Sequence, residues 1–161
     1  MGQMRAKRKG FTMRIKEFFI DCVPPRTTHQ SGSQIMVGKY GKRFVGQNAR
    51  GRATKQELQS LVLPHKPIAP YTDALRIEIT YRFPMRKSEK AALKRLPAIP
   101  CTKRPDADNL AKGLLDVMQG LFFLDDAQVY NLSITKLYAQ RTGIAVKIYA
   151  IDENTISHYM K

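Results

Sequence analysis

The segment Leu75–Phe83 alternates apolar and polar residues without a break, and this pattern limits the folds open to the chain more than any other. Successive side chains of a strand point to opposite faces, so the alternation predicts a strand with one apolar face. The residues expected on that face are Leu75, Ile77, Ile79, Tyr81 and Phe83. A strand of this kind needs neighbouring strands and a layer packed on its apolar side.

Three further segments have strand-like composition. Met13–Cys22 contains Phe18, Phe19 and Ile20 and is followed by two prolines, which cannot extend a central strand. Val129–Tyr138 and Ile144–Ile151 are rich in Ile, Val, Tyr and Thr. Only the short segment from Ala139 to Gly143 joins them, so we expect these last two strands to pair as an antiparallel hairpin.

The clearest helix is expected over Asp108–Leu121, where apolar residues recur at helical spacing and Gly120 lies near the end. A capping box at Thr54–Glu57 predicts a second helix that stops at Pro64, and Ser88 is a candidate cap for a short third helix through Leu96. Residues 31–53 are rich in Gly, Ser, Lys and Arg; we expect a loop, with a hairpin over Ile35–Val45 as the alternative.

These elements predict an α+β fold: a small mixed or antiparallel sheet with helices packed on it. The 161 residues, 43% of them hydrophobic, suit one domain spanning 1–161, with residues 1–10 as a flexible basic tail. Cys22 and Cys101 form no CxxC pair, so neither a disulfide framework nor a zinc site is indicated. No apolar run approaches the roughly 20 residues of a membrane span, and we expect a soluble cytoplasmic protein.

The net charge of +15 predicts a polyanionic partner. Basic residues are concentrated in three runs, at 1–16, 39–55 and 82–104, whereas residues 106–126 hold five of the thirteen acids and the single base Lys112. Carboxylates repel phosphates, so they add no affinity to a surface that only binds nucleic acid. Mg²⁺ is bound by carboxylate and phosphate oxygens together, so the contrast suggests metal-assisted chemistry on a phosphodiester.

Two acidic pairs stand out within this window. Asp106 and Asp108 open the expected helix, with Lys112 one turn along the same face, and Asp125 and Asp126 immediately precede a strand. Each pair has an ordinary alternative, because aspartates cap helices and shape turns. Together they favour a metal site, in which the helix start and the strand start would meet.

The residues Pro105-Asp106-Ala107-Asp108-Asn109-Leu110-Ala111-Lys112, followed by Leu115-Asp116, Gly120 and Asp125-Asp126-Ala127-Gln128-Val129, resemble the RusA family of Holliday-junction resolvases. The resemblance covers roughly residues 103–150. It implies that Asp106, Asp108 and Asp126 hold Mg²⁺, that Mn²⁺ can substitute, and that Lys112 is catalytic. For Asp125 it leaves open whether the side chain assists the metal or shapes the turn.

The same resemblance implies an endodeoxyribonuclease of bacterial or phage origin that works on four-way DNA junctions near the nucleoid as a symmetric homodimer. Candidate DNA-binding residues are Lys39, Lys42, Arg43, Lys103 and Arg104. Tyr40 could stack on unpaired bases at a branch point or merely belong to a hairpin. The competing hypothesis is a basic DNA- or RNA-binding protein without catalysis, in which the aspartates only cap and turn.

Overall fold

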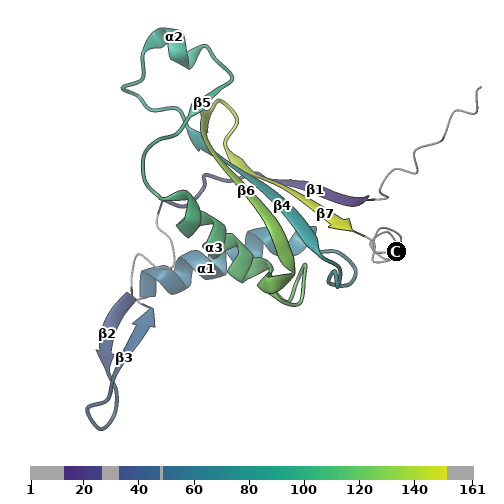
Figure 1. Cartoon of the computed structure of the whole chain (residues 1–161). Helices are drawn as coiled ribbons and strands as arrows, with labels where there is room; N and C mark the ends of the chain where they lie inside the picture. Colours follow the sequence, from purple (N-terminus) through teal and green to yellow (C-terminus); the bar gives the residue numbers. More distant parts are fainter. Residues whose placement is uncertain (1–12, 27–32, 48, 152–161) are drawn as a thin grey trace, which may run out of the picture.

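A five-stranded sheet in the order β1-β7-β4-β6-β5 forms the centre of the protein (Figure 1). The computed structural model describes residues 13–26, 33–47 and 49–151. β4 and β6 are parallel, and every other neighbouring pair is antiparallel, so the sheet is mixed. The strands are β1 (Met13–Ile20), β4 (Leu75–Pro84), β5 (Ala98–Pro100), β6 (Val129–Ala139) and β7 (Gly143–Ile151).

Two helices, α1 (Ala49–Val62) and α3 (Ala107–Met118), pack on one face of this sheet (Figure 1). The apolar side chains of β4 are all buried, as the alternation predicts. Under them lie the buried residues of α3, which include Leu110, Leu114 and Val117. This arrangement confirms the expected α+β fold. Within the described residues, no helix is both long and apolar enough to cross a membrane.

The expected hairpin between the last two strands is wrong, because β4 lies between them. β7 pairs with β4 on one side and β1 on the other, while β6 pairs with β4 in parallel. The step from Ala139 to Gly143 covers up to about 13 Å of extended chain, and two strand spacings need only about 10 Å. The short connection is therefore long enough to pass over the end of β4.

Gly143, where this connection enters β7, lies against β1. Its φ is +149°, and a Cβ there would lie 2.3 Å from Phe19 Cζ and 2.5 Å from the Ile20 carbonyl oxygen. We expect Gly143→Ala to lower the free energy of unfolding by roughly 2–3 kcal/mol, measured by urea denaturation. Gly120→Ala is the control, since Gly120 has φ +78° but nothing within 4 Å of the added methyl. Equal losses in the two variants would contradict the clash.

Residues 33–47 form a projecting ribbon rather than the expected loop (Figure 1). β2 (Ser33–Val37) and β3 (Arg43–Gln47) pair antiparallel, so the alternative hairpin is confirmed. Gly38 N donates to Lys42 O at 2.8 Å, and the turn places Tyr40 and Gly41 at φ 77° and 73°. Glycine tolerates this left-handed conformation, and the turn therefore closes tightly.

The first helix begins earlier than its capping box predicts. α1 starts at Ala49, five residues before Thr54, so Thr54 lies inside the helix. Alanine and arginine are strong helix formers, and the four residues Ala49, Arg50, Arg52 and Ala53 extend the helix toward β3. The expected tail at residues 1–10 lies outside the described residues.

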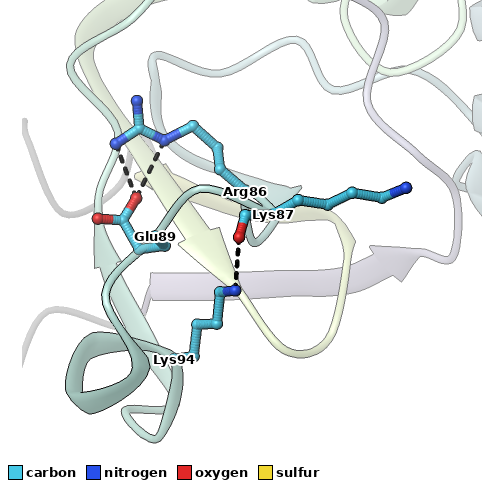
Figure 2. Close-up of polar contacts among 4 residues, drawn as sticks. All are labelled: Arg86, Lys87, Glu89 and Lys94. Atoms are coloured by element: carbon cyan, nitrogen blue, oxygen red, sulfur yellow. Dashed lines mark hydrogen bonds and ion pairs between the residues drawn. The ribbon is translucent and has the colours of Figure 1, made fainter.

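Residues 85–100 form a flap beyond the end of β4 (Figure 1). The expected helix here is short: α2 covers only Ala91–Lys94, and Lys90 rather than Ser88 is its N-cap residue. Figure 2 shows contacts within the flap. Arg86 donates through two nitrogens to Glu89, and Lys94 Nζ donates to Lys87 O at 2.6 Å. The following residues form β5, a strand that the sequence did not predict.

Candidate active site

Both carboxylates of the Asp-x-Asp pair are exposed at the start of α3. Asp106 is the N-cap residue, with extended backbone, and Asp108 lies in the first turn. The Asp106 side chain makes no hydrogen bond to the amides of the helix. Capping, which is the ordinary structural reason for an aspartate here, is therefore not what this carboxylate does.

Lys112 lies one turn beyond Asp108 and is exposed. The helix that carries both side chains is fixed to the sheet by Tyr81, whose hydroxyl donates to the Leu110 carbonyl at 2.9 Å. Burial raises the pKa of the Tyr81 hydroxyl well above its ordinary value, so the group stays protonated and keeps donating. The sheet thus sets the position of the two carboxylates and the lysine.

Lys136 of β6 holds the segment that leads into α3. Its Nζ donates to Lys103 O at 2.8 Å and to Pro105 O at 2.7 Å, while its own carbonyl accepts from Cys101 N at 3.0 Å. The Arg104–Pro105 peptide bond is cis. Sequence reasoning missed Lys136, because a lysine in a strand 31 residues from its partner has no local signal.

Asp125 has a structural role in the turn before β6. Its Oδ1 accepts from Ala127 N at 2.9 Å and caps the short 3-10 helix η3 (Asp126–Gln128). The open question about Asp125 is thus answered in part, because one of its oxygens is used by the turn. Asp126, the first residue of η3, is exposed, and its side chain does not take part in this cap.

Gln128 fixes this turn to the rest of the protein. Its Oε1 accepts from the backbone amides of Leu124 and Asp125, at 2.8 and 2.9 Å. Its Nε2 donates to the carbonyls of Tyr71 and Asp73, both at 3.1 Å. The glutamine of the Asp-Asp-x-Gln-Val string therefore positions the aspartates before it. The string pointed to Gln128, but its partners 55 and 57 residues away could not be predicted.

α3 carries the chain from the side of the flap to the turn before β6 (Figure 1), with the first acidic pair at its start and the second pair in that turn. Asp106 adjoins Pro105, which contacts Lys136 near the end of β6. Asp126 comes three residues before Val129, where β6 begins. Seven residues of strand separate Val129 from Lys136, a length of about 23 Å. The expectation that the helix start and the strand start meet is therefore wrong within a single chain.

Two carboxylates are nevertheless as many as a protein usually contributes to a bound Mg²⁺. Within residues 13–26, 33–47 and 49–151, no three His, Cys, Asp or Glu side chains are grouped so that they could hold an ion. Mg²⁺ keeps several waters and is bound through one or two carboxylates plus phosphate oxygens. Asp106 and Asp108 offer only oxygen donors, so the donor set at the start of α3 fits Mg²⁺ or Mn²⁺.

Basic residues lie near this site and on the projecting ribbon. Lys103 and Arg104 are exposed directly before Asp106. The three other candidates for phosphate binding, Lys39, Lys42 and Arg43, are exposed around the turn of the β2–β3 ribbon. Tyr40 at the tip is 92% exposed, so it does not pin the ribbon to the described part of the protein.

Comparison with known families adds a decisive observation. The profile of the family described as "Endodeoxyribonuclease RusA" matches residues 23–149. This chain belongs to the RusA endodeoxyribonuclease family. The match includes the β2–β3 ribbon, the flap, α3 and both acidic pairs. A Bacillus subtilis (strain 168) protein named "Uncharacterized protein YqaN" is 27% identical over 113 residues, which cover 67% of this chain and 80% of YqaN.

Membership of the RusA family relates the exposed aspartates to the cleavage of DNA. Endodeoxyribonucleases break phosphodiester bonds within DNA, and the cationic surface expected for that substrate is present beside the start of α3. The aspartates, Lys112 and the basic residues all lie within the matched range.

Proposed function

We propose that this RusA-family protein is a magnesium-dependent endodeoxyribonuclease that resolves four-way DNA junctions by paired, symmetric nicks. The observation that carries the proposal is the start of α3, where Asp106, Asp108 and Lys112 are exposed together beside Lys103 and Arg104. Bound Mg²⁺, or Mn²⁺ in its place, would supply an activated water and neutralise charge on the phosphate. The family match adds DNA as the substrate.

Each part of the chain has a distinct task in this proposal. Asp106 and Asp108 hold the metal, and Asp125 shapes the turn that carries Asp126. Asp126 is too far from these two carboxylates in its own chain, so in this proposal it reaches a metal only in the second chain of the homodimer. Lys112 orients the attacking water or stabilises charge that develops on the phosphate. Lys103 and Arg104 hold the DNA backbone next to the carboxylates. We place this work in the cytoplasm, on bacterial or phage DNA, and assign it to a homodimer of single-domain chains.

The proposal is tested by comparing a four-way junction with a linear duplex of the same sequence, each in Mg²⁺, in Mn²⁺ and in EDTA. We expect symmetric paired nicks on the junction alone, and only with a divalent ion present. Junction binding without nicks in Mg²⁺ would instead favour the competing hypothesis of a binding protein without catalysis. Equal cutting of both substrates would contradict junction selectivity.

The basic ribbon should contribute affinity rather than chemistry. We expect the triple variant Lys39→Ala/Lys42→Ala/Arg43→Ala to weaken junction binding and to reduce the slope of log affinity against log salt by about 0.9 for each phosphate that the ribbon no longer neutralises. The nicking rate at saturating enzyme should stay close to that of wild type. The measurement is a salt titration of fluorescence anisotropy, and an unchanged slope would exclude phosphate binding by the ribbon.

Lys136 should act as a positioning residue. Lys136→Met removes the donor that holds Pro105 O and Lys103 O, so we expect nicking to fall roughly 10–100-fold, as for other residues that orient metal ligands. Lys136→Arg keeps a cationic donor and should recover most of the rate. The half-saturating Mg²⁺ concentration should rise in Lys136→Met, and a loss of rate at unchanged Mg²⁺ dependence would contradict the role.

A further inference from the structure

The tip of the β2–β3 ribbon holds a tyrosine in a backbone conformation that suits glycine. Gly41 N donates to Gly38 O at 3.1 Å, so residues 38–41 form a β-turn with Tyr40 in its third position. Tyr40 has a φ of 77°, and a turn with positive φ at this position normally has Gly or Asn there. A bulky side chain in this conformation strains the backbone. The shape of the turn therefore gives no reason for a tyrosine.

Packing gives no reason for this tyrosine either. Tyr40 is 92% exposed, and Ile35 and Val37 on β2 are 72% and 68% exposed. These side chains face solvent because the ribbon projects away from the sheet and its helices (Figure 1). An aromatic ring buries a large area when it meets a partner, so an exposed ring at a projecting tip is suited to binding.

Positive charge surrounds the ring of Tyr40. Lys39 precedes Tyr40, Lys42 and Arg43 follow the turn, and all three cations are exposed. Residues 33–47 contain no acidic residue. Such a surface attracts a polyanion and disfavours an apolar protein partner. An aromatic ring among cations is the combination that binds nucleic acid with unstacked bases, because the cations neutralise phosphates while the ring stacks on a base.

A continuous duplex offers no free base to this ring. Each base pair is covered on both faces by its neighbours, and an aromatic ring can stack on it only after the neighbours have been separated at a cost in free energy. At the centre of a four-way junction the strands pass from one arm to another, so the base pairs there unstack at the lowest cost. The ring of Tyr40 therefore distinguishes a branch point from linear DNA, whereas the cations around it meet phosphates in both.

The ribbon is connected to the first acidic pair through the two helices. β3 contacts α1, and α1 contacts α3, whose start carries Asp106 and Asp108. α1 is itself anchored in the core by Leu58 and Val62, which are buried. The position of the tip is therefore set relative to the candidate metal site, and a ring seated at the branch point would fix where the cut phosphate lies.

We propose that Tyr40 stacks on a base pair at the branch point and thereby gives the protein a preference for four-way junctions over linear duplex. Lys39, Lys42 and Arg43 add affinity for the phosphates of either substrate. The inference rests on the proposed function for the identity of the substrate. Binding is measured in EDTA, without cleavage, so the role of Tyr40 is decided separately from the nuclease chemistry.

Fluorescence anisotropy in EDTA measures the affinity for a four-way junction and for a linear duplex of the same sequence. Tyr40→Ala should weaken junction binding roughly 5- to 150-fold, the cost of losing one base–aromatic stack, and should change duplex binding by less than about twofold. Tyr40→Phe keeps the ring and should bind like wild type. Ile35→Ala is the matched control, since it removes an exposed apolar side chain from the same ribbon away from the tip. Equal losses on both substrates in Tyr40→Ala, or an equally large loss in Tyr40→Phe, would overturn the stacking.

Tyr40→Gly separates the effect of the ring from that of the turn. Glycine adopts a positive φ without strain, so this variant keeps the turn and lacks only the side chain. It should lose the preference for junctions as Tyr40→Ala does. A retained preference in Tyr40→Gly would mean that the shape of the ribbon, and not the ring, recognises the branch point.

The place of contact is tested with 2-aminopurine, a fluorescent base analogue whose emission depends on stacking. Saturating wild type should change the emission of the analogue at the branch point and leave it unchanged one helical turn along an arm, and Tyr40→Ala should remove most of the change. An equal change in Tyr40→Ala would overturn the inference.

The two proposals fail in different ways. If wild type prefers the junction but does not nick it in Mg²⁺, the nuclease function fails while Tyr40 keeps its role. If wild type nicks junctions and Tyr40→Ala retains the preference in binding, the inference about Tyr40 fails alone.

Discussion

Asp106→Asn should reduce junction nicking by at least about a thousandfold, equivalent to about 4 kcal/mol of lost transition-state stabilisation. The reason is that the amide keeps the shape of the side chain but is a poor ligand for a hard cation. The fold should not change, because the Asp106 side chain is exposed and makes no capping hydrogen bond. Single-turnover cleavage of a labelled junction measures the loss.

The same variant should bind the junction at least as tightly as wild type does. Replacing a carboxylate by an amide removes one negative charge from a surface that faces phosphates. Anisotropy in EDTA isolates this effect from metal binding. Asp21→Asn is the control, since Asp21 is exposed and its contact with Arg141 at 3.4 Å is a surface pair; its nicking rate should stay within about twofold of wild type. Binding more than tenfold weaker in Asp106→Asn would count against the assignment.

Local patterns in the sequence predicted the elements that carry the site. The alternation in Leu75–Phe83 corresponds to β4, and the apolar spacing after Asp108 corresponds to α3, although that helix ends at Met118 rather than Leu121. Both patterns report burial on one face of an element. They succeed because β4 and α3 pack directly on each other, as the Tyr81–Leu110 hydrogen bond shows.

The order of the strands could not be predicted in the same way. A short connection favours pairing of the strands that it joins, and nothing local to Val129–Ala139 or Gly143–Ile151 shows that β4 lies between them. This wrong prediction of the hairpin also affected the predicted site. Pairing of the last two strands does not say where β6 runs relative to α3, and that position decides whether the two acidic pairs meet. The contacts of Lys136 and Gln128, which span 31 to 57 residues, determine that path.

The separation of the acidic pairs follows from this path. Asp106 and Asp126 are 20 residues apart, and α3 occupies 12 of them, so the helix alone carries the chain about 18 Å. The return that would bring Asp126 back does not occur before β6 begins. A spacing of 20 residues is thus compatible with convergence and with separation, and the path of the chain after α3 decides between the two cases.

Lys112 should contribute to the chemical step rather than to the affinity for DNA. Its ammonium is exposed one helical turn from Asp108, so in the proposed mechanism it would lie beside the phosphate that the carboxylates bring to the metal. We expect Lys112→Ala to lower the single-turnover rate roughly 100- to 1000-fold, the usual cost of removing one donor that stabilises developing charge. Junction affinity should fall much less, since one ammonium neutralises at most one phosphate of the DNA backbone.

Two comparisons distinguish a role of Lys112 in the chemical step from mere binding of the DNA backbone. Lys103→Ala removes an equal charge two residues before Pro105 and should weaken binding without a comparable loss of rate at saturation. The half-saturating Mg²⁺ concentration should be unchanged in Lys112→Ala, because no ligand is removed, but should rise in Asp108→Asn. If low salt or excess enzyme restored the rate of Lys112→Ala, Lys112 would only hold DNA, and the charge on the phosphate would have to be stabilised by other groups.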